Sequence, residues 1–287
     1  GAATAAPASL MFTTGNWNVP QTVTIDAPQD VDTADEAASI TLSATGLTTR
    51  TVSVSVNDDD TQVIVATPNS VSMTENGTQT VNVHLGFKPA TDVVVTPSTL
   101  DPAVATVPAT ALTFTPSNYA SDQAVIISAP DDADAVAGST TFRLESVAAG
   151  LLTNVPVAVA DDDHLTINVS SNTAMLTEGG TASFTVVLGA QPPGAVSVAV
   201  LSNDLGALTA SPAMVNFTAA TWNVPQTVTL TGVQDVDLTD ETATITLAAS
   251  GLPSTVVNAS ITDDDAQGIV LSAASVNVTE GATGRYQ

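Results

Sequence analysis

The chain has 287 residues, of which 29 are acidic and four are basic, so its formal net charge is −25 at neutral pH. A surface this acidic repels nucleic acid and anionic membranes, so neither is an expected partner. The chain has no cysteine for a disulfide framework and no apolar stretch long enough to span a membrane. Hydrophobic residues nevertheless make up 44% of it in a periodic arrangement, which favours a folded protein over a disordered one.

A triplet of aspartates divides the chain into repeats. The triplets begin at residues 58, 161 and 263, so they recur after 103 and then 102 residues. The sequence Trp-Asn-Val-Pro-Gln at 17–21 returns unchanged at 222–226. This period predicts four segments. They are residues 1–60, the C-terminal part of a repeat; 61–163 and 164–265, two complete repeats; and 266–287, the N-terminal part of a further repeat.

Inside a repeat, apolar and polar residues alternate, as at 182–188 and 242–248. This period, and the abundance of Val and Thr, are typical of half-buried β-strands. We predict about seven antiparallel strands in each repeat and no helix of useful length. The expected fold class is all-β, with tandem seven-stranded immunoglobulin-like β-sandwiches arranged end to end.

The junctions between repeats are expected to be stiff. Asp60 is followed closely by Val63-Ile64-Val65, and Asp163 by Leu165-Thr166-Ile167. No stretch rich in Gly, Ser or Pro separates the triplet from the next strand, so neighbouring domains are not expected to swing freely.

Acidic residues fall in the loops that a sandwich of this topology gathers at one pole, where the last strand also ends. We expect them to be metal ligands. In the third repeat they are Glu178, Asp204, Asp235, Asp237, Asp240, Glu241, Asp263, Asp264 and Asp265. In the second repeat they are Glu75, Asp101, Asp131, Asp132, Asp134, Asp161, Asp162 and Asp163. In the first segment they are Asp30, Asp32, Asp35, Glu36, Asp58, Asp59 and Asp60.

So many carboxylates cannot all ionise at one pole without a counter-charge, and this chain supplies few basic residues. Calcium, which takes about six to eight oxygen ligands in irregular geometry, is the expected ion. Zinc is not expected, because cysteine is absent and the two histidines lie far apart in the sequence. The second repeat has Ala137-Gly138 where the third has Asp240-Glu241, so we expect it to bind fewer ions.

Several motifs of the third repeat resemble the Calx-beta domain. They are Thr-Glu-Gly-Gly at 177–180, the segment around Phe217, Asp-Val-Asp at 235–237 and the closing triplet at 263–265. The resemblance implies calcium ligands at Glu178, Asp235, Asp237, Glu241 and Asp263 to Asp265. It also implies tandem arrays in large bacterial surface or secreted adhesins. The chain departs from the family's pattern at 222–226, where many members have Pro-Gly-Glu.

The expected function is that of a non-catalytic spacer or stalk in an extracellular or cell-surface protein, rigidified by calcium at domain poles and junctions. A glycosidase is not expected, since its acid must be held protonated in a cleft and these carboxylates crowd on loops. One alternative is a self-assembling filament subunit, a homopolymer in which the two terminal segments complement each other's strands. Another is a carbohydrate- or receptor-binding adhesion module, which two Trp and two Tyr support poorly.

Overall fold

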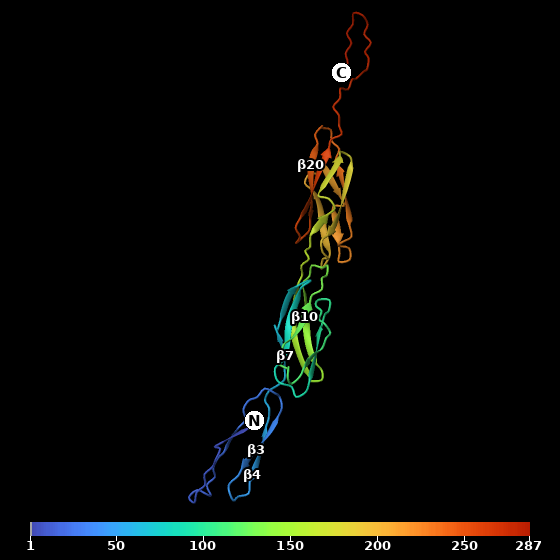
Figure 1. Cartoon of the computed structure of the whole chain (residues 1–287). Helices are drawn as coiled ribbons and strands as arrows, with labels where there is room; N and C mark the ends of the chain where they lie inside the picture. The colour runs from blue at the N-terminus through green and yellow to red at the C-terminus, as the bar shows by residue number, and fades with distance from the viewer. Residues whose placement is uncertain (1) are drawn as a thin grey trace. The chain divides into compact units, whose positions relative to one another are not determined.

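The computed structural model describes residues 2–287, which form two compact units (Figure 1). Unit 1 comprises the described residues up to Asp132 together with Ala137–Asp161, and unit 2 comprises Ala133–Val136 and Asp162–Gln287. The regular elements of the described chain are strands, so the all-β prediction is confirmed. Nowhere in this range does a helix occur that is long and apolar enough to cross a membrane.

The second repeat forms a sandwich of two sheets within unit 1. One sheet has the order β10-β7-β5, with β5 at Ile64–Thr67, β7 at Thr78–Leu85 and β10 at Gln123–Ser128. The facing sheet has the order β6-β12-β11-β8-β9. Its strands are β6 (Val71–Thr74), β8 (Val93–Thr99), β9 (Leu112–Phe114), β11 (Gly138–Ser146) and β12 (Leu151–Ala160).

The third repeat forms a similar sandwich in unit 2. Its four-stranded sheet has the order β13-β15-β19-β17, and its five-stranded sheet the order β14-β21-β20-β16-β18. The strands of the first sheet are β13 (Ile167–Val169), β15 (Thr181–Leu188), β17 (Leu208–Ser211) and β19 (Gln226–Gly232). Those of the second are β14 (Thr173–Thr177), β16 (Val196–Ser202), β18 (Met214–Phe217), β20 (Glu241–Ala248) and β21 (Thr255–Thr262).

Both sandwiches differ from the predicted seven antiparallel strands in one shared way, and the third repeat also has the additional strand β17. The first predicted strand is two strands that belong to different sheets, β5 and β6 in one repeat and β13 and β14 in the other. Between β5 and β6 lies Pro68, which has no N–H to donate to a ladder, so the strand cannot continue in its first sheet. After the break, β6 and β14 pair with the last strand of their repeat in parallel, not antiparallel, orientation.

Each sandwich encloses its own core, in which aliphatic side chains surround very few aromatic ones. Phe114 and Phe142 are fully buried in the second repeat, and Phe217 is fully buried in the third. Val, Leu and Ile fill most of the remaining core positions. Burying one such side chain contributes about 1.5–3 kcal/mol, so each core stabilises its own repeat.

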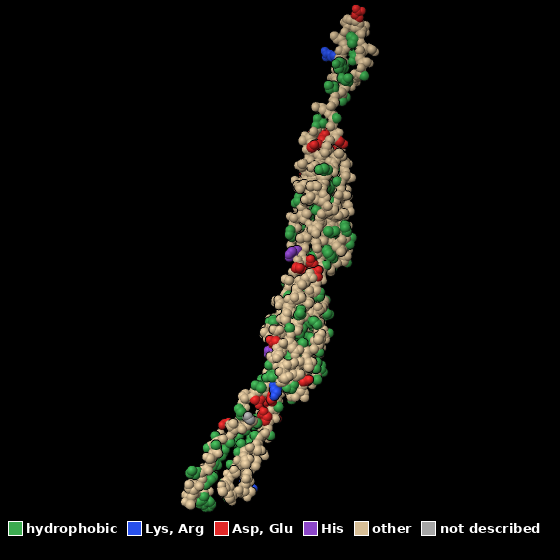
Figure 2. Space-filling model, viewed as in Figure 1, with side chains coloured by type: hydrophobic (Ala, Val, Ile, Leu, Met, Phe, Trp, Pro, Cys, Tyr) green, Lys and Arg blue, Asp and Glu red, His purple; other side chains and the backbone are tan. Residues whose placement is uncertain are grey.

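Residues 2–60 form two pairs of strands, and several of their large apolar side chains are exposed. Strands β1 (Thr4–Ala6) and β2 (Thr24–Asp26) pair with each other, as do β3 (Glu36–Leu42) and β4 (Arg50–Val56). Figure 2 shows hydrophobic side chains along this part of the chain. Phe12 is 53% exposed, although its counterparts Phe114 and Phe217 are fully buried.

Residues 266–287 contain no assigned strand. They fold back on themselves, with the backbone N–H of Ser272 donating to the carbonyl of Gln287 at 2.7 Å. Their apolar side chains, among them Val276 and Val278, are exposed.

Candidate metal centre

In unit 2, the ends of β14, β19 and β21 bring acidic side chains together at one pole of the sandwich. Because β14 and β21 run parallel, they finish side by side, and the N–H of Glu178 donates to the carbonyl of Thr262 at 3.0 Å. This bond places Glu178 beside the triplet that begins at Asp263. Gly179 then turns the chain with a φ of +64°, in the left-handed region that favours glycine.

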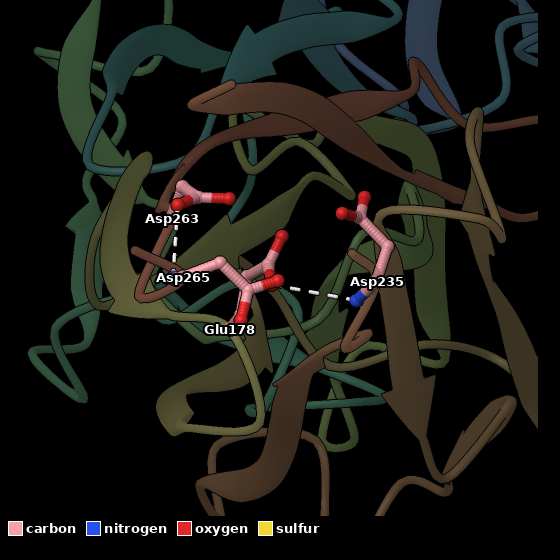
Figure 3. A group of neighbouring side chains, drawn as sticks. All are labelled: Glu178, Asp235, Asp263 and Asp265. Carbon is pink, nitrogen blue, oxygen red and sulfur yellow. Dashed lines mark hydrogen bonds between the residues drawn. The ribbon is translucent and has the colours of Figure 1, made fainter. Parts of the chain in front are cut away.

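Four carboxylates meet there to form what we call site A. Glu178, Asp235, Asp263 and Asp265 each offer an oxygen, and these oxygens lie within 4.8 Å of one another. Figure 3 shows the four side chains converging from three separate segments. On the face drawn in Figure 2, most of the visible acidic side chains gather in small groups, and few lie on the flanks of the sandwiches.

Glu178 is the most buried member of site A, with 3% of its surface exposed. Its Oε2 atom accepts hydrogen bonds from Gln234 Nε2 at 3.2 Å and from the Asp235 N–H at 3.4 Å. Its Oε1 atom is buried with no hydrogen-bond partner. A buried carboxylate oxygen without a partner costs free energy, and a bound cation would remove that cost.

A second group, site B, shares one residue with site A. It consists of Asp235, Asp237 and Glu241, whose oxygens also lie within 4.8 Å of one another. Oε2 of Glu241 is buried and has no hydrogen-bond partner. Since Asp235 belongs to both groups, its carboxylate is placed to bridge two neighbouring cations.

The electrostatics of both groups favour proton uptake when no cation is bound. Burial raises the pKa of Glu178, and the nearby carboxylate of Asp235 raises it further. Burial, together with a hydrogen bond to Asp235, raises the pKa of Glu241 to about 7. Burial also raises the pKa of Asp263. Each carboxyl is therefore held towards its neutral form by the same crowding that a divalent cation would relieve.

Backbone hydrogen bonds hold the aspartates in tight turns. Oδ1 of Asp235 accepts from the Asp237 N–H at 2.8 Å, and Oδ1 of Asp237 from the Thr239 N–H at 2.7 Å. Oδ1 of Asp263 likewise accepts from the Asp265 N–H at 2.9 Å. Aspartate is favoured in such turns because its side chain can hydrogen-bond the backbone two residues on. Asp263 Oδ2 is buried and has no hydrogen-bond partner.

Three predicted ligands of the third repeat lie outside both sites. Asp204 Oδ1 accepts from the N–H of Gly206 at 2.9 Å, which closes the turn after β16. Asp240 Oδ1 accepts from the Asp263 N–H at 2.9 Å. Asp264 Oδ1 accepts from Gln234 Nε2 at 2.7 Å. Asp240 and Asp264 thus connect the loops that carry the sites.

The second repeat has a counterpart of site A, formed in unit 1 by Glu75, Asp132 and Asp161. Glu75 is 7% exposed. Asp131 also offers an oxygen within 4.8 Å of one on Glu75, and it accepts from Asn76 Nδ2 at 2.8 Å. Asp101 lies outside the group and accepts from the Ala103 N–H at 3.0 Å. The remaining predicted ligands of this repeat, Asp134, Asp162 and Asp163, belong to unit 2.

Site B has no equivalent glutamate in the second repeat, because Gly138 occupies the position of Glu241. A Cβ atom added at Gly138 would lie 2.9 Å from Cγ1 of Val104. The residue that corresponds to Val104 in the third repeat is the smaller Ala207. In the second repeat, the glutamate of site B is therefore absent at a position where the larger side chain of Val104 leaves less room for it.

The first segment, unlike the second repeat, retains the glutamate of site B. Asp30, Asp32 and Glu36 form a group equivalent to site B. A hydrogen bond to the backbone N–H of Asp32 lowers the pKa of Asp30, and the side-chain hydrogen bond with Asp30 raises the pKa of Glu36. Lys88 Nζ lies 3.9 Å from Asp32 Oδ2, at the edge of this group.

The remaining acidic residues of the first segment repeat the contacts of the third repeat. Asp35 Oδ1 accepts from the Asp58 N–H at 2.8 Å, and Asp58 Oδ1 accepts from the Asp60 N–H at 2.8 Å. Asp59 Oδ1 accepts from Gln29 Nε2 at 2.7 Å. Burial raises the pKa of Asp60.

Gln234 was missing from the sequence prediction, although it hydrogen-bonds both Glu178 and Asp264. Its counterpart Gln29 makes the equivalent bond to Asp59. Both glutamines stand immediately before the first aspartate of the acidic loop. That repeated position is the signal by which the sequence could have identified them.

A scan against protein-family models and a search of curated proteins found no match for this chain. Similar solved structures include domains 4 and 5 of the S-layer protein SbsC, at 19% identity and a TM-score of 0.32, covering 58% of this chain and 76% of that one. The Yersinia pseudotuberculosis adhesin InvE is 14% identical with a TM-score of 0.31, covering 70% of this chain and 58% of that one. PcdhgB3 EC1-4 is 9% identical with a TM-score of 0.35, and the match covers 86% of this chain and 64% of that one. This chain thus spans less than two thirds of the length of the InvE and PcdhgB3 chains.

Proposed function

We propose that the chain is a calcium-binding, non-catalytic structural segment of an extracellular or cell-surface protein. The observation that carries this proposal is Glu178, a buried carboxylate with one oxygen unpartnered, facing Asp235, Asp263 and Asp265. The proposed structural units are the repeats 61–163 and 164–265. The Calx-beta resemblance agrees with calcium at the pole that carries sites A and B.

Calcium suits this pole better than other common divalent ions. The ligands present are carboxylate oxygens from three loops, which favours a hard cation. Magnesium requires near-ideal octahedral geometry, whereas calcium tolerates the irregular set that sites A and B offer. The described clusters contain no histidine, so zinc has no nitrogen ligand there.

The proposed role of the ion is to fix the acidic loop against its neighbour. In unit 1, the acidic loop of the first segment contacts the loop that follows β7. There the Lys88 N–H donates to the Val31 carbonyl at 2.8 Å. Calcium held by Asp30, Asp32 and Glu36 would immobilise the same loop. A segment that is ordered in this way transmits force between repeats, which is the property that a stalk needs.

The alternative of a carbohydrate-binding module has less support. Trp222 packs against the core of the third repeat. Trp17 is exposed beside Phe12, but these positions are the inner face of an open sandwich, as the buried Phe114 and Phe217 show. The aromatic residues therefore serve core packing in both complete repeats.

The test is calcium titration of the 287-residue chain by calorimetry, together with thermal melts in calcium and in chelator. Extracellular modules bind calcium with Kd of about 10⁻⁴ to 10⁻³ M, so millimolar calcium should stabilise each site by roughly 0.4–1.4 kcal/mol. Glu178→Gln should remove one binding event. The matched control is Glu145→Gln, which breaks only the 2.9 Å ion pair with Arg143 at the surface. No calcium heat and unchanged melts would rule out the proposal.

A further inference from the structure

In each complete sandwich, a strand close to the start of the repeat runs in parallel beside the last strand. In the second repeat, Val71–Thr74 (β6) lies beside Val157–Ala160 of β12. In the third repeat, Thr173–Thr177 (β14) lies beside Asn258–Thr262 of β21. Strands close to both ends of the repeat are therefore hydrogen-bonded directly to each other.

This pairing determines how tension along the chain acts on a repeat. Tension pulls β14 from its first residue and β21 from its last, because those ends lead out of the repeat. Parallel strands that are pulled from opposite ends slide along each other, so their hydrogen bonds carry the load together. Antiparallel strands that are joined by a turn and pulled from their free ends instead separate one bond at a time.

We propose that the pairs β6–β12 and β14–β21 are mechanical clamps that keep the complete repeats folded under tension. The strands that precede them, β5 and β13, are four and three residues long. Tension releases these short strands first and then reaches the clamp. This inference rests on the proposed function, since a stalk is the setting that supplies the tension.

The clamp of the third repeat is longer than that of the second. β14 and β21 are in register over five residues, whereas β6 and β12 are in register over four. The Asn258 N–H also donates to the carbonyl of Asn172 at 2.9 Å, one residue before β14 begins. Pro156 stands at the position of Asn258 in the second repeat and has no N–H to donate. The third repeat should therefore resist the higher force.

Site A connects the two strands of this clamp at their ends. Glu178 directly follows β14, and Asp263 directly follows β21. The Glu178 N–H donates to the carbonyl of Thr262 at 3.0 Å. The carboxylates of Glu178 and Asp263 offer oxygens within 4.8 Å of each other. A calcium ion held by both would cross-link the two strands, so calcium should raise the force that the third repeat resists.

The test is single-molecule force spectroscopy of the 287-residue chain, held by a cysteine added at each end, since the native chain has none. Unfolding one complete repeat of about 100 residues should lengthen the chain by roughly 300 Å, at up to about 3.6 Å per residue. We expect two such events, with the third repeat unfolding at the higher force. Forced unfolding reports the rate of unfolding, so it measures the clamp and not the equilibrium stability.

Two substitutions change the clamps in opposite directions. Asn258→Pro removes one hydrogen bond and should speed unfolding of the third repeat at constant force roughly tenfold, the effect of one backbone hydrogen bond. Pro156→Asn supplies the missing N–H and should slow unfolding of the second repeat. The control is Phe217→Ala, in β18 outside the clamp. It should cost more equilibrium stability than Asn258→Pro does but speed forced unfolding less. The reverse order would overturn the clamp.

Measurements in calcium and in chelator separate this inference from the proposed function. Calcium should slow forced unfolding of the third repeat, and Glu178→Gln should remove that difference. Calcium that binds by calorimetry but leaves forced unfolding unchanged would overturn the cross-link and leave the proposed function intact. A chain that binds no calcium but loses mechanical resistance with Asn258→Pro would reject the calcium proposal and support the clamp.

Discussion

The backbone N–H of Asp235 lies 3.4 Å from Oε2 of Glu178, while the other oxygen of Glu178 is buried without a hydrogen-bond partner. Asp235 thus hydrogen-bonds the buried carboxylate of Glu178 through its backbone N–H and places its own carboxylate close to it. The same side chain also reaches Asp237 and Glu241 in site B. Asp235 therefore connects both sites, and its removal should have a larger effect than removal of any other ligand.

Single substitutions should separate the two sites of the third repeat. Asp235→Asn is expected to remove calcium binding from both, because it belongs to both groups. Glu178→Gln should affect site A alone and Glu241→Gln site B alone. Calorimetric stoichiometry measures the difference. Asp204→Asn is the control: it should leave stoichiometry unchanged, since Asp204 caps a turn outside both sites. Loss of one binding event by Asp204→Asn would contradict this assignment.

The ion-free chain should lose stability as pH rises from about 4.5 to about 7. The folded state raises the pKa of Glu241 from 4.5 to about 7, so across this interval it holds a proton that the unfolded chain has released. The free energy of unfolding, measured with denaturant in chelator, should therefore fall over this range and then level off. Calcium should bind more tightly as pH rises, because it displaces that proton.

Glu241→Gln isolates this effect from the other titrating groups. The variant should show a smaller fall in the free energy of unfolding between pH 5 and pH 7 than the native chain does. Equal slopes for the two proteins would show that Glu241 is not the group responsible.

Site B should be transferable to the second repeat. Gly138→Glu alone is expected to bind calcium poorly, because its new Cβ would lie 2.9 Å from a methyl group of Val104. The double variant Val104→Ala/Gly138→Glu reproduces the pair Ala207 and Glu241 and should add one calcium per chain. Val104→Ala alone serves as the control for the cavity it creates. If calorimetry shows no added calcium for the double variant, residues beyond this pair decide the site.

The three equivalent phenylalanines should differ in their effect on stability. Phe114→Ala and Phe217→Ala are each expected to cost about 3–5 kcal/mol, because both rings are fully buried. Phe12→Ala should cost less than about 1 kcal/mol, as its ring is 53% exposed. Denaturation of dilute protein in chelator measures all three. A comparable loss for Phe12→Ala would mean that its face is covered in solution.

Local patterns predicted the elements of this fold well. The alternation at 182–188 is the strand β15, and the alternation at 242–248 lies within β20. Each of these strands buries one face against its own core, so its period of two is visible in the sequence itself. The division of the first strand was not predicted, because switching between sheets depends on which edge is open, and periodicity does not record that.

For the acidic residues too, the sequence predicted some features and not others. Their positions along the sequence predicted a polar cluster, and the pairing of β14 with β21 gathers Glu178 with Asp263. Sequence spacing could not distinguish Asp235, which faces two groups, from Asp204 and Asp240, which bind backbone N–H groups. All three are aspartates at loop positions, and only the path of the chain decides what each oxygen meets.

The sequence by itself determined the period, the strand character, the acidic loops and the absence from the second repeat of a counterpart to Glu241, because these depend on residue type and local order. Only the tertiary structure decided that Glu178 is buried with an unpartnered oxygen, that Val104 stands beside Gly138, and that β14 pairs with β21 in parallel. Burial and pairing arise between segments far apart in the chain, and no local pattern encodes them.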